Sequence, residues 1–235
     1  MESGYDSDMQ RNHHLQIARL GQALASPVRL RALNLLAQRA WRVGELGIEL
    51  GESLAATSAH LKTLRAAGMV ANKKRGREVW CRVESDEVLR LLAAAERAAE
   101  GLLPEMREAV REANADPYLL RGEQLHELAR KVAGGEVLLI DLRPDDEFQA
   151  GHLPGAESYP FPRLETLDLK PLRDKSPIVA YCRGPWCRMA RQGVNRLNER
   201  GIPAKRLRLG LVQWRAEGLD WIQPPPSNQN PPTDS

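Results

Sequence analysis

The sequence predicts a two-domain protein, with a mainly α-helical domain followed by an α/β domain whose parallel sheet is flanked by helices. Three observations support this. The first half has helical periodicity and ends in an alternating hairpin pattern; the second contains short apolar runs typical of buried strands; and Asn-Ala-Asp-Pro interrupts the pattern between them. We expect domains at 1–113 and 119–222, a linker at 114–118 and a disordered tail, rich in Pro, Asn and Ser, at 223–235.

Composition excludes little by itself. The 235 residues are 42% hydrophobic, enough for real cores, and the net charge of +3 is spread evenly over both halves. Bulk charge therefore does not indicate a nucleic-acid partner. Three cysteines without a signal peptide predict a protein of the reducing cytoplasm, and no apolar run is long enough to span a membrane, so no membrane partner is expected.

The first half predicts two helices joined by a tight turn. An amphipathic stretch at 15–25 precedes them, and Ser26-Pro27 has the residues of a helix N-cap and first turn. A short helix is then expected at 43–50 and a second one at 54–67, capped by Ser53 and ended by glycine. This is the spacing of a helix-turn-helix unit.

The outward face of the second helix is small, polar or basic, whereas Leu54, Leu61 and Leu64 are expected to face inward. Such a face suits a helix lying in the major groove of DNA. The candidate DNA-contacting residues on it are Ala56, Thr57, Ser58, His60, Lys62, Thr63 and Arg65.

A hairpin follows directly, with strands predicted at 69–71 and 78–83 and a tip at 72–77. The tip carries the cations Lys73, Lys74, Arg75 and Arg77. A charged tip is more often simply solvated. Beside a helix-turn-helix it is better interpreted as a wing that contacts backbone phosphates, which makes binding salt-dependent.

Apolar residues at steps of three and four predict one long helix over 86–113, with a bend at Pro104. A stripe of this length is either core or a dimer seam. Because an amphipathic N-terminal helix accompanies it, we favour the dimer seam.

In the second half, buried strands are predicted at 137–140 and 178–181. Cys182 stands where the second strand ends, Gly184 and Pro185 force a turn, and a helix begins near Arg188. Backbone N–H groups and a helix dipole at such a loop favour the thiolate, which suits a nucleophilic cysteine. Two alternatives remain. Cys182 could be a cysteine that merely packs. It could also be the nucleophile of a cysteine-dependent phosphatase or arsenate reductase, whose cysteine and arginine have the spacing of Cys182 and Arg188.

The first half resembles the ArsR family of winged helix-turn-helix repressors over about residues 12–110. The matching residues are Leu24-Ala25-Ser26-Pro27-Val28-Arg29-Leu30-Arg31, Glu45-Leu46, Ser58-Ala59-His60-Leu61-Lys62-Thr63-Leu64 and Gly68-Met69-Val70. The resemblance implies a homodimer that binds a two-fold-symmetric, double-stranded operator. Metal-sensing members often have cysteines where this chain has Gly47 and Glu49, so we expect no metal and no cofactor.

The second half resembles the rhodanese (sulfurtransferase) domain. The matching residues are Asp141-Leu142-Arg143, Glu147-Phe148, Gly151-His152-Leu153-Pro154-Gly155-Ala156, Gly210, Trp214 and Gly218. The resemblance implies that Cys182 carries a persulfide sulfur in a loop stabilised by its amides and Arg183. The candidate catalytic residues are Cys182, Arg183, Gly184, Pro185, Trp186, Cys187, Arg188, Asp141 and Arg143. Cys187, where rhodaneses often have Thr, Ser or Arg, either resolves the persulfide into a disulfide or only fills a helix start.

These halves together suggest a dimeric transcriptional regulator whose rhodanese domain senses or transfers sulfane sulfur, from a small donor such as thiosulfate or polysulfide, through Cys182. The alternative is that the protein is primarily a sulfurtransferase enzyme and binds DNA only for autoregulation. A third hypothesis is an arsenate reductase or phosphatase, in which Arg188 would be essential.

Overall fold

The computed structural model describes residues 2–122, 124–173, 175 and 177–223, and divides them into two compact units that meet in the chain between Ser85 and Asp86. The tail predicted at 223–235 lies outside the described residues apart from its first position. The sequence places 86–113 with the DNA-binding half, whereas here these helices group with the α/β half. The two units are called the N-terminal and the C-terminal unit below.

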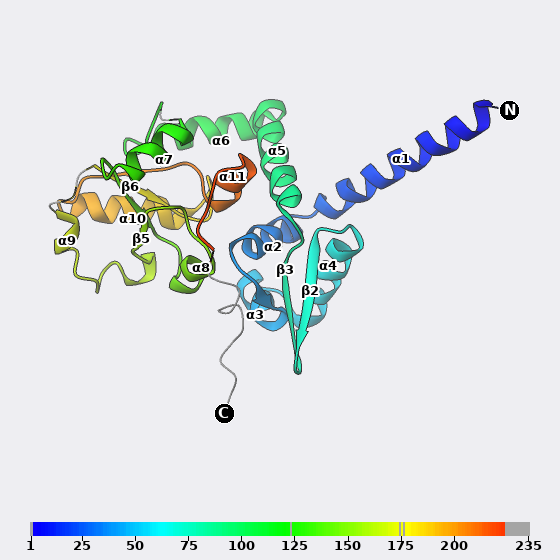
Figure 1. Cartoon of the computed structure of the whole chain (residues 1–235), viewed down its shortest axis with the longest axis horizontal. Helices are drawn as coiled ribbons and strands as arrows, with labels where there is room; N and C mark the ends of the chain where they lie inside the picture. Colours follow the sequence, from blue (N-terminus) through cyan, green and yellow to red (C-terminus); the bar gives the residue numbers. More distant parts are fainter. Residues whose placement is uncertain (1, 123, 174, 176, 224–235) are drawn as a thin grey trace. The chain divides into compact units, whose positions relative to one another are not determined.

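The N-terminal unit consists of helices and a small antiparallel sheet of order β1-β3-β2 (Figure 1). Its elements are α1 (Glu2–Leu24), α2 (Pro27–Gln38), β1 (Trp41–Arg42), α3 (Val43–Leu50), α4 (Leu54–Ala66), β2 (Val70–Arg75) and β3 (Glu78–Val83). The predicted caps are confirmed: Ser26 accepts a hydrogen bond from the Arg29 N–H, and Ser53 accepts one from the Ala56 N–H.

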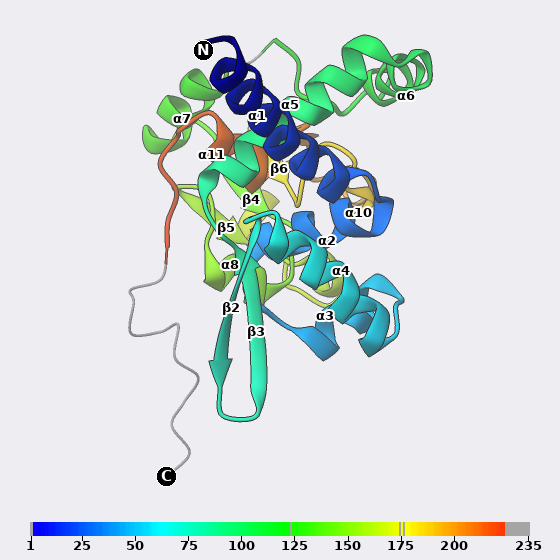
Figure 2. The same ribbon diagram turned by 90° about the vertical axis from the view of Figure 1, so that its right-hand side faces the viewer.

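Two details of the N-terminal unit differ from the sequence prediction. Leu54 is 62% exposed, because it is the first residue of α4 and lies beyond the packed face that buries Leu61 and Leu64. The wing strand β2 continues through Arg75, so the turn is confined to Gly76 and Arg77. Gly76 has φ 58°, which lets so tight a turn close the hairpin. β2 and β3 run together to a tip beyond α3 and α4 (Figures 1 and 2).

The C-terminal unit contains a parallel sheet of order β5-β4-β6-β7, which confirms the predicted α/β class. Its elements are α5 (Asp86–Leu102), α6 (Pro104–Asn114), α7 (Leu125–Ala133), β4 (Leu138–Asp141), α8 (Asp145–Ala150), β5 (Ala156–Ser158), the 3₁₀ turn η1 (Phe161–Arg163), α9 (Lys170–Arg173), β6 (Ile178–Tyr181), α10 (Arg188–Glu199), β7 (Ala204–Arg206) and α11 (Leu211–Ala216).

The sheet is covered on both faces because alternate residues of its strands point in opposite directions. Ile178 and Ala180 of β6 join the apolar cluster that contains Val194 of α10. Val179 belongs to the opposite cluster, which includes Trp214 of α11. The β6 run is therefore apolar throughout, as expected for a central parallel strand.

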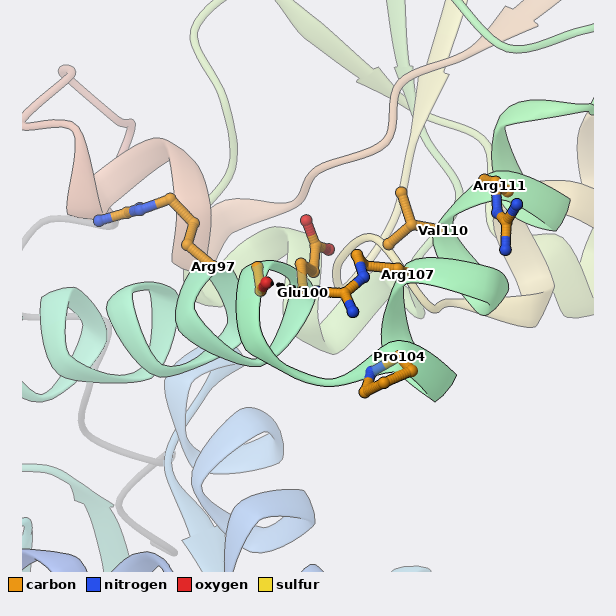
Figure 3. Close-up of a pocket in the computed structure, with 7 residues that line it drawn as sticks. Arg97, Glu100, Pro104, Arg107, Val110 and Arg111 are labelled. Atoms are coloured by element: carbon orange, nitrogen blue, oxygen red, sulfur yellow. Dashed lines mark hydrogen bonds between the residues drawn. The ribbon is translucent and has the colours of Figure 1, made fainter.

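The helix predicted over 86–113 is interrupted, not merely bent. Leu103 adopts an extended conformation, φ −96° and ψ 122°, between α5 and α6. This follows from Pro104, whose ring disfavours a helical conformation for the preceding residue. An open groove of about 830 Å³ lies at this elbow. It is lined by Arg97, Glu100, Gly101, Pro104, Arg107, Val110 and Arg111 (Figure 3).

Candidate functional site

Two sequence-predicted site residues meet at the carboxyl edge of the parallel sheet. Cys182 follows the last residue of β6, and Asp141 is the last residue of β4. The two strands are hydrogen-bonded neighbours, with Asp141 paired to Tyr181. In open α/β sheets this edge is where ligands bind and chemistry is placed.

The cysteine loop, residues 182–187, folds back so that its two thiols meet. The Cys187 N–H donates to the Gly184 carbonyl at 3.1 Å, and Cys187 is the N-cap of α10. The Sγ atoms of Cys182 and Cys187 share a hydrogen bond at 2.6 Å. Cys182 has no exposed surface, whereas Cys187 is half-buried. The loop therefore presents Cys187 outward and holds Cys182 beneath it.

The remaining predicted loop residues form its rim. Trp186 is 40% exposed and Arg188 is exposed, whereas Pro185 is half-buried and Gly184 is buried.

The acidities of the two thiols differ in the direction opposite to the sequence prediction, which placed the thiolate on Cys182. Burial, and then the hydrogen bond with Cys187, raise the pKa of Cys182 well above its ordinary value. The hydrogen bond with Cys182, together with backbone N–H groups at the start of α10, lowers the pKa of Cys187 to about 6. The helix N-terminus thus stabilises an anion as expected, but on Cys187.

Labelling of Cys187 by iodoacetamide should report this directly. Below its pKa the thiol is protonated and unreactive, so the labelling rate should rise with pH and level off above about pH 6. In Cys182→Ala, which removes the hydrogen-bond partner of Cys187, the midpoint should move upward towards that of an ordinary cysteine. Peptide mass spectrometry measures both profiles, with the fully buried Cys81 as an internal unlabelled control. A wild-type midpoint near 8.5, the ordinary cysteine value, contradicts the assignment.

Arg183 is held by a carboxylate of the protein. Its Nε donates to both carboxylate oxygens of Glu147, at 2.9 and 3.0 Å, and its Nη2 donates to Oε1 at 2.5 Å. Glu147 is only 1% exposed, and burial raises its pKa although the Arg183 hydrogen bonds oppose this. The contact ties the start of the cysteine loop to α8. The predicted contact of Arg183 with a sulfur anion stays a prediction.

Asp141 and Arg143 form a buried ion pair beneath the loop. Arg143 donates to Asp141 from its backbone N–H and from Nε and Nη2, and also reaches the Gly151 carbonyl at 2.7 Å. The Tyr181 hydroxyl donates to Asp141 at 2.5 Å and accepts from the Leu153 N–H. Although burial alone would lower it, the charge of Asp141 keeps the pKa of Arg143 above its ordinary value.

Asp141 and Arg143 are therefore fully buried, and their hydrogen bonds go to each other, to Tyr181 and to the Gly151 carbonyl. The sequence prediction did not include Tyr181, the partner of Asp141, or Glu147, the partner of Arg183. The sequence does hold a sign of the role of Tyr181, because a tyrosine in an otherwise apolar run needs a hydrogen-bond partner for its hydroxyl. For Glu147 the sequence holds no such sign beyond its place in the Glu-Phe motif.

In the N-terminal unit, the predicted DNA-contacting face of α4 is largely accessible. Ser58, Lys62, Thr63 and Arg65 are exposed, and Ala56 and His60 are half-buried. Thr57 requires a correction, because it is fully buried and its hydroxyl donates to the Ser53 carbonyl at 2.9 Å. A hydroxyl that is satisfied within its own helix and packs against Gly47 is not available to DNA.

The wing cations lie beside this face. Lys73 and Lys74 are exposed on β2, and Arg77 is exposed at the turn. A groove of about 640 Å³ has lining residues from α3, α4 and the hairpin, including Ser58, Arg65 and Arg77. Helix α4 and the hairpin thus border one common depression, which Glu45 and Glu78 also line.

Within the described residues, no three histidine, cysteine or acidic side chains cluster closely enough to hold a metal ion. The described helices likewise include none that is both long and apolar enough to cross a membrane.

Comparison with known proteins supports the family resemblance of both halves of the chain. Residues 26–72 match the family "Bacterial regulatory protein, arsR family", and residues 124–217 match the rhodanese-like domain. The HTH-type transcriptional regulator Rv0324 of Mycobacterium tuberculosis is 37% identical over 206 residues, which cover 87% of this chain and 89% of that protein. The HTH-type transcriptional regulator CmtR of Mycobacterium bovis is 34% identical over 105 residues, covering 38% of this chain and 89% of CmtR.

Among solved structures, the homodimeric winged helix-turn-helix domain of Mb0332 from Mycobacterium bovis is 33% identical and covers 42% of this chain and 91% of that one, with a TM-score of 0.39. The match to Rv0324 spans both units of the chain. The chain therefore belongs to the ArsR family of HTH-type transcriptional regulators and carries a C-terminal rhodanese-like domain.

Proposed function

We propose that this DNA-binding regulator responds to sulfane sulfur, which Cys182 takes up from a donor such as thiosulfate or polysulfide. The observation that carries the proposal is the thiol pair, with sulfurs 2.6 Å apart in a loop at the carboxyl edge of the sheet. A buried thiol beside a more acidic one has its proton acceptor in place.

The chemistry follows from the pair. The Cys182 sulfur attacks the outer sulfur of thiosulfate, and Cys187 accepts the Cys182 proton as the new S–S bond forms. The S–S bond of thiosulfate breaks, sulfite leaves with the electron pair, and Cys182 retains a persulfide. Cys187, once deprotonated again, attacks Cys182 Sγ, and the persulfide bond breaks to release hydrosulfide. The two thiols lose two electrons in forming the disulfide, and thiosulfate is reduced to sulfite and hydrosulfide.

We further propose that the regulator acts as a homodimer on double-stranded operator DNA. The exposed residues of α4 would contact base edges, and the wing cations would contact phosphates. Exposed apolar side chains on α1 support a self-association surface in the N-terminal unit, where Leu15 and Ile17 are 57% and 53% exposed.

The test is peptide mass spectrometry of reduced protein after exposure to thiosulfate or polysulfide. Wild type should acquire a Cys182–Cys187 disulfide, Cys187→Ser should retain one added sulfur on Cys182, and Cys182→Ser should retain none. DNA affinity is then compared across these states at several salt concentrations, since phosphate contacts make it salt-dependent.

An unmodified Cys182 peptide would remove sulfur chemistry from the proposal and leave the regulator. Turnover with cyanide or a thiol acceptor, with DNA affinity indifferent to the state of Cys182, would instead favour the sulfurtransferase alternative. Competition by phosphate or arsenate at Cys182 would favour the phosphatase or reductase reading.

A further inference from the structure

The cysteine loop is connected to α5 through one arginine of the segment after β7. The Arg208 guanidinium carbon lies 5.2 Å from the centroid of the Trp186 ring, over the exposed part of the loop. The same side chain donates to Glu100 of α5 at 2.6 Å. A planar guanidinium can stack on an aromatic ring and bind a carboxylate at the same time. Arg208 therefore contacts the loop on one side and α5 on the other.

A second connection reinforces the first. Gln213 of α11 accepts a hydrogen bond from the Gly210 N–H at 3.0 Å and donates to Glu96 of α5 at 2.8 Å. Gly210 itself lies against the backbone of Cys182 and Arg183, with no room for a side chain. Residues 208–213 thus touch both the cysteine loop and α5.

α5 is also the helix that begins directly after the wing. β3 ends at Val83 and α5 begins at Asp86, so two residues separate the last wing strand from the helix that Arg208 contacts. Glu96 and Glu100 lie in the C-terminal half of α5, so a displacement there would have to travel along the helix to Asp86 before it could reach β3.

Modification must disturb the loop because the pair has no spare room. Cys182 has no exposed surface, and its carbonyl faces Gly210 at a distance that excludes even a Cβ atom. Because Cys182 is fully buried, an added sulfur on its Sγ atom requires neighbouring residues of the loop to move, and a disulfide draws together two sulfurs that now lie 2.6 Å apart. Trp186 lies within the loop and, being 40% exposed, is its least constrained side chain. Its movement changes the surface on which Arg208 stacks.

We propose that Arg208 is the positioning residue that reports the state of the cysteine loop to α5. The proposal rests on the proposed function, since it names the residue through which a modification of the cysteine loop affects α5. Such a link has a coupling free energy only if Arg208 binds Glu100 and Trp186 differently in the two loop states. The buried Nε of Arg208 has no hydrogen-bond partner among the described residues. This N–H group is therefore available to form a new hydrogen bond when Arg208 changes its contacts.

The experiment uses the full chain and a DNA fragment selected from a random pool by the reduced wild-type protein. Two treatments modify the loop: polysulfide, and diamide, which forms the Cys182–Cys187 disulfide without any sulfur donor. Mass spectrometry confirms the modification before fluorescence anisotropy measures the ratio of Kd values for modified and reduced protein. Wild type should give a ratio of about 5-fold or more in either direction, the usual scale of coupling between sites.

Arg208→Glu and Glu100→Arg should each bring the ratio close to one while leaving modification at the cysteines intact. The double variant, which restores the ion pair with reversed charges, should regain part of the ratio. The matched control is Arg97→Glu, because Arg97 and Glu217 form a neighbouring exposed ion pair at 3.7 Å with no contact to the loop. It should keep the wild-type ratio.

The proposal is overturned if Arg208→Glu keeps the wild-type ratio, or if the diamide disulfide does not change DNA affinity in the wild type. If instead the proposed function is wrong, polysulfide will leave Cys182 unmodified. The diamide-induced disulfide would still test the role of Arg208 in that case.

Discussion

Arg143→Met is expected to destabilise the C-terminal unit by about 3–5 kcal/mol, because it leaves the fully buried Asp141 carboxylate without its cationic partner. The Gly151 carbonyl loses a donor in the same variant. Urea unfolding, followed by hydrogen exchange of peptides covering β4 and β6, separates this effect from the N-terminal unit. Sulfur uptake at Cys182 should fall with stability, since the pair supports the carboxyl edge of both strands.

The matched control is Arg163→Met. Arg163 binds Asp145 at 2.8 Å, but these side chains are 57% and 40% exposed, so its loss should cost at most about 1 kcal/mol. Combining Asp141→Asn with Arg143→Met should recover part of the stability lost in the single variant, because no unpaired charge is then buried. Equal destabilisation by Arg143→Met and Arg163→Met would contradict the account.

Sequence predicted the elements wherever local chemistry decides them. The sequence predicts the Ser26 and Ser53 caps, the bounds of α3 and the strand β6 correctly. Caps and apolar strands depend on only a few neighbouring residues, so a local pattern is enough to identify them. The pairing of β4 with β6, which brings Asp141 beside Tyr181, follows from the parallel class once both strands are recognised.

The differences arise where contacts distant in sequence decide the outcome. Helical spacing alone gave Thr57 an outward direction, whereas packing against α3 buries it. The loop pattern favoured a thiolate at Cys182, yet burial, which no pattern reports, transfers the anion to Cys187. The hydrogen bond from Arg208 to Glu100 joins residues 108 positions apart in the sequence.

The site also explains why a rhodanese-like loop suits a regulator. Cys182 is fully buried, so it can react only with molecules that the loop admits, and Gly210 is packed directly against its carbonyl. Glu147 and Gly210 both constrain the start of the loop, Glu147 through the Arg183 side chain and Gly210 through the backbone of Cys182 and Arg183. In the proposed coupling, a bond change at the thiols would therefore displace the later part of the loop, where Trp186 is exposed.

Gly210→Ala is therefore expected to have the second large effect. A Cβ at this position would lie 2.4 Å from the Cys182 carbonyl oxygen and 2.5 Å from the Arg183 carbonyl carbon. Both atoms belong to the backbone, so no side-chain rotation relieves the overlap and the loop must shift. The conformation of Gly210 is ordinary extended chain, φ −138°, so the cost is one of space and not of backbone strain.

We expect Gly210→Ala to lose sulfur uptake and to move the midpoint of Cys187 labelling upward, because the 2.6 Å thiol contact no longer forms. Overpacking of this kind typically costs about 1–3 kcal/mol, which thermal unfolding can measure. Gly101→Ala is the control, since a Cβ there meets nothing within 4 Å, and a helical glycine replaced by alanine should gain roughly 0.5–1 kcal/mol. Wild-type labelling and sulfur uptake in Gly210→Ala would show that the loop tolerates displacement, and the basis for its coupling to α5 would be lost with it.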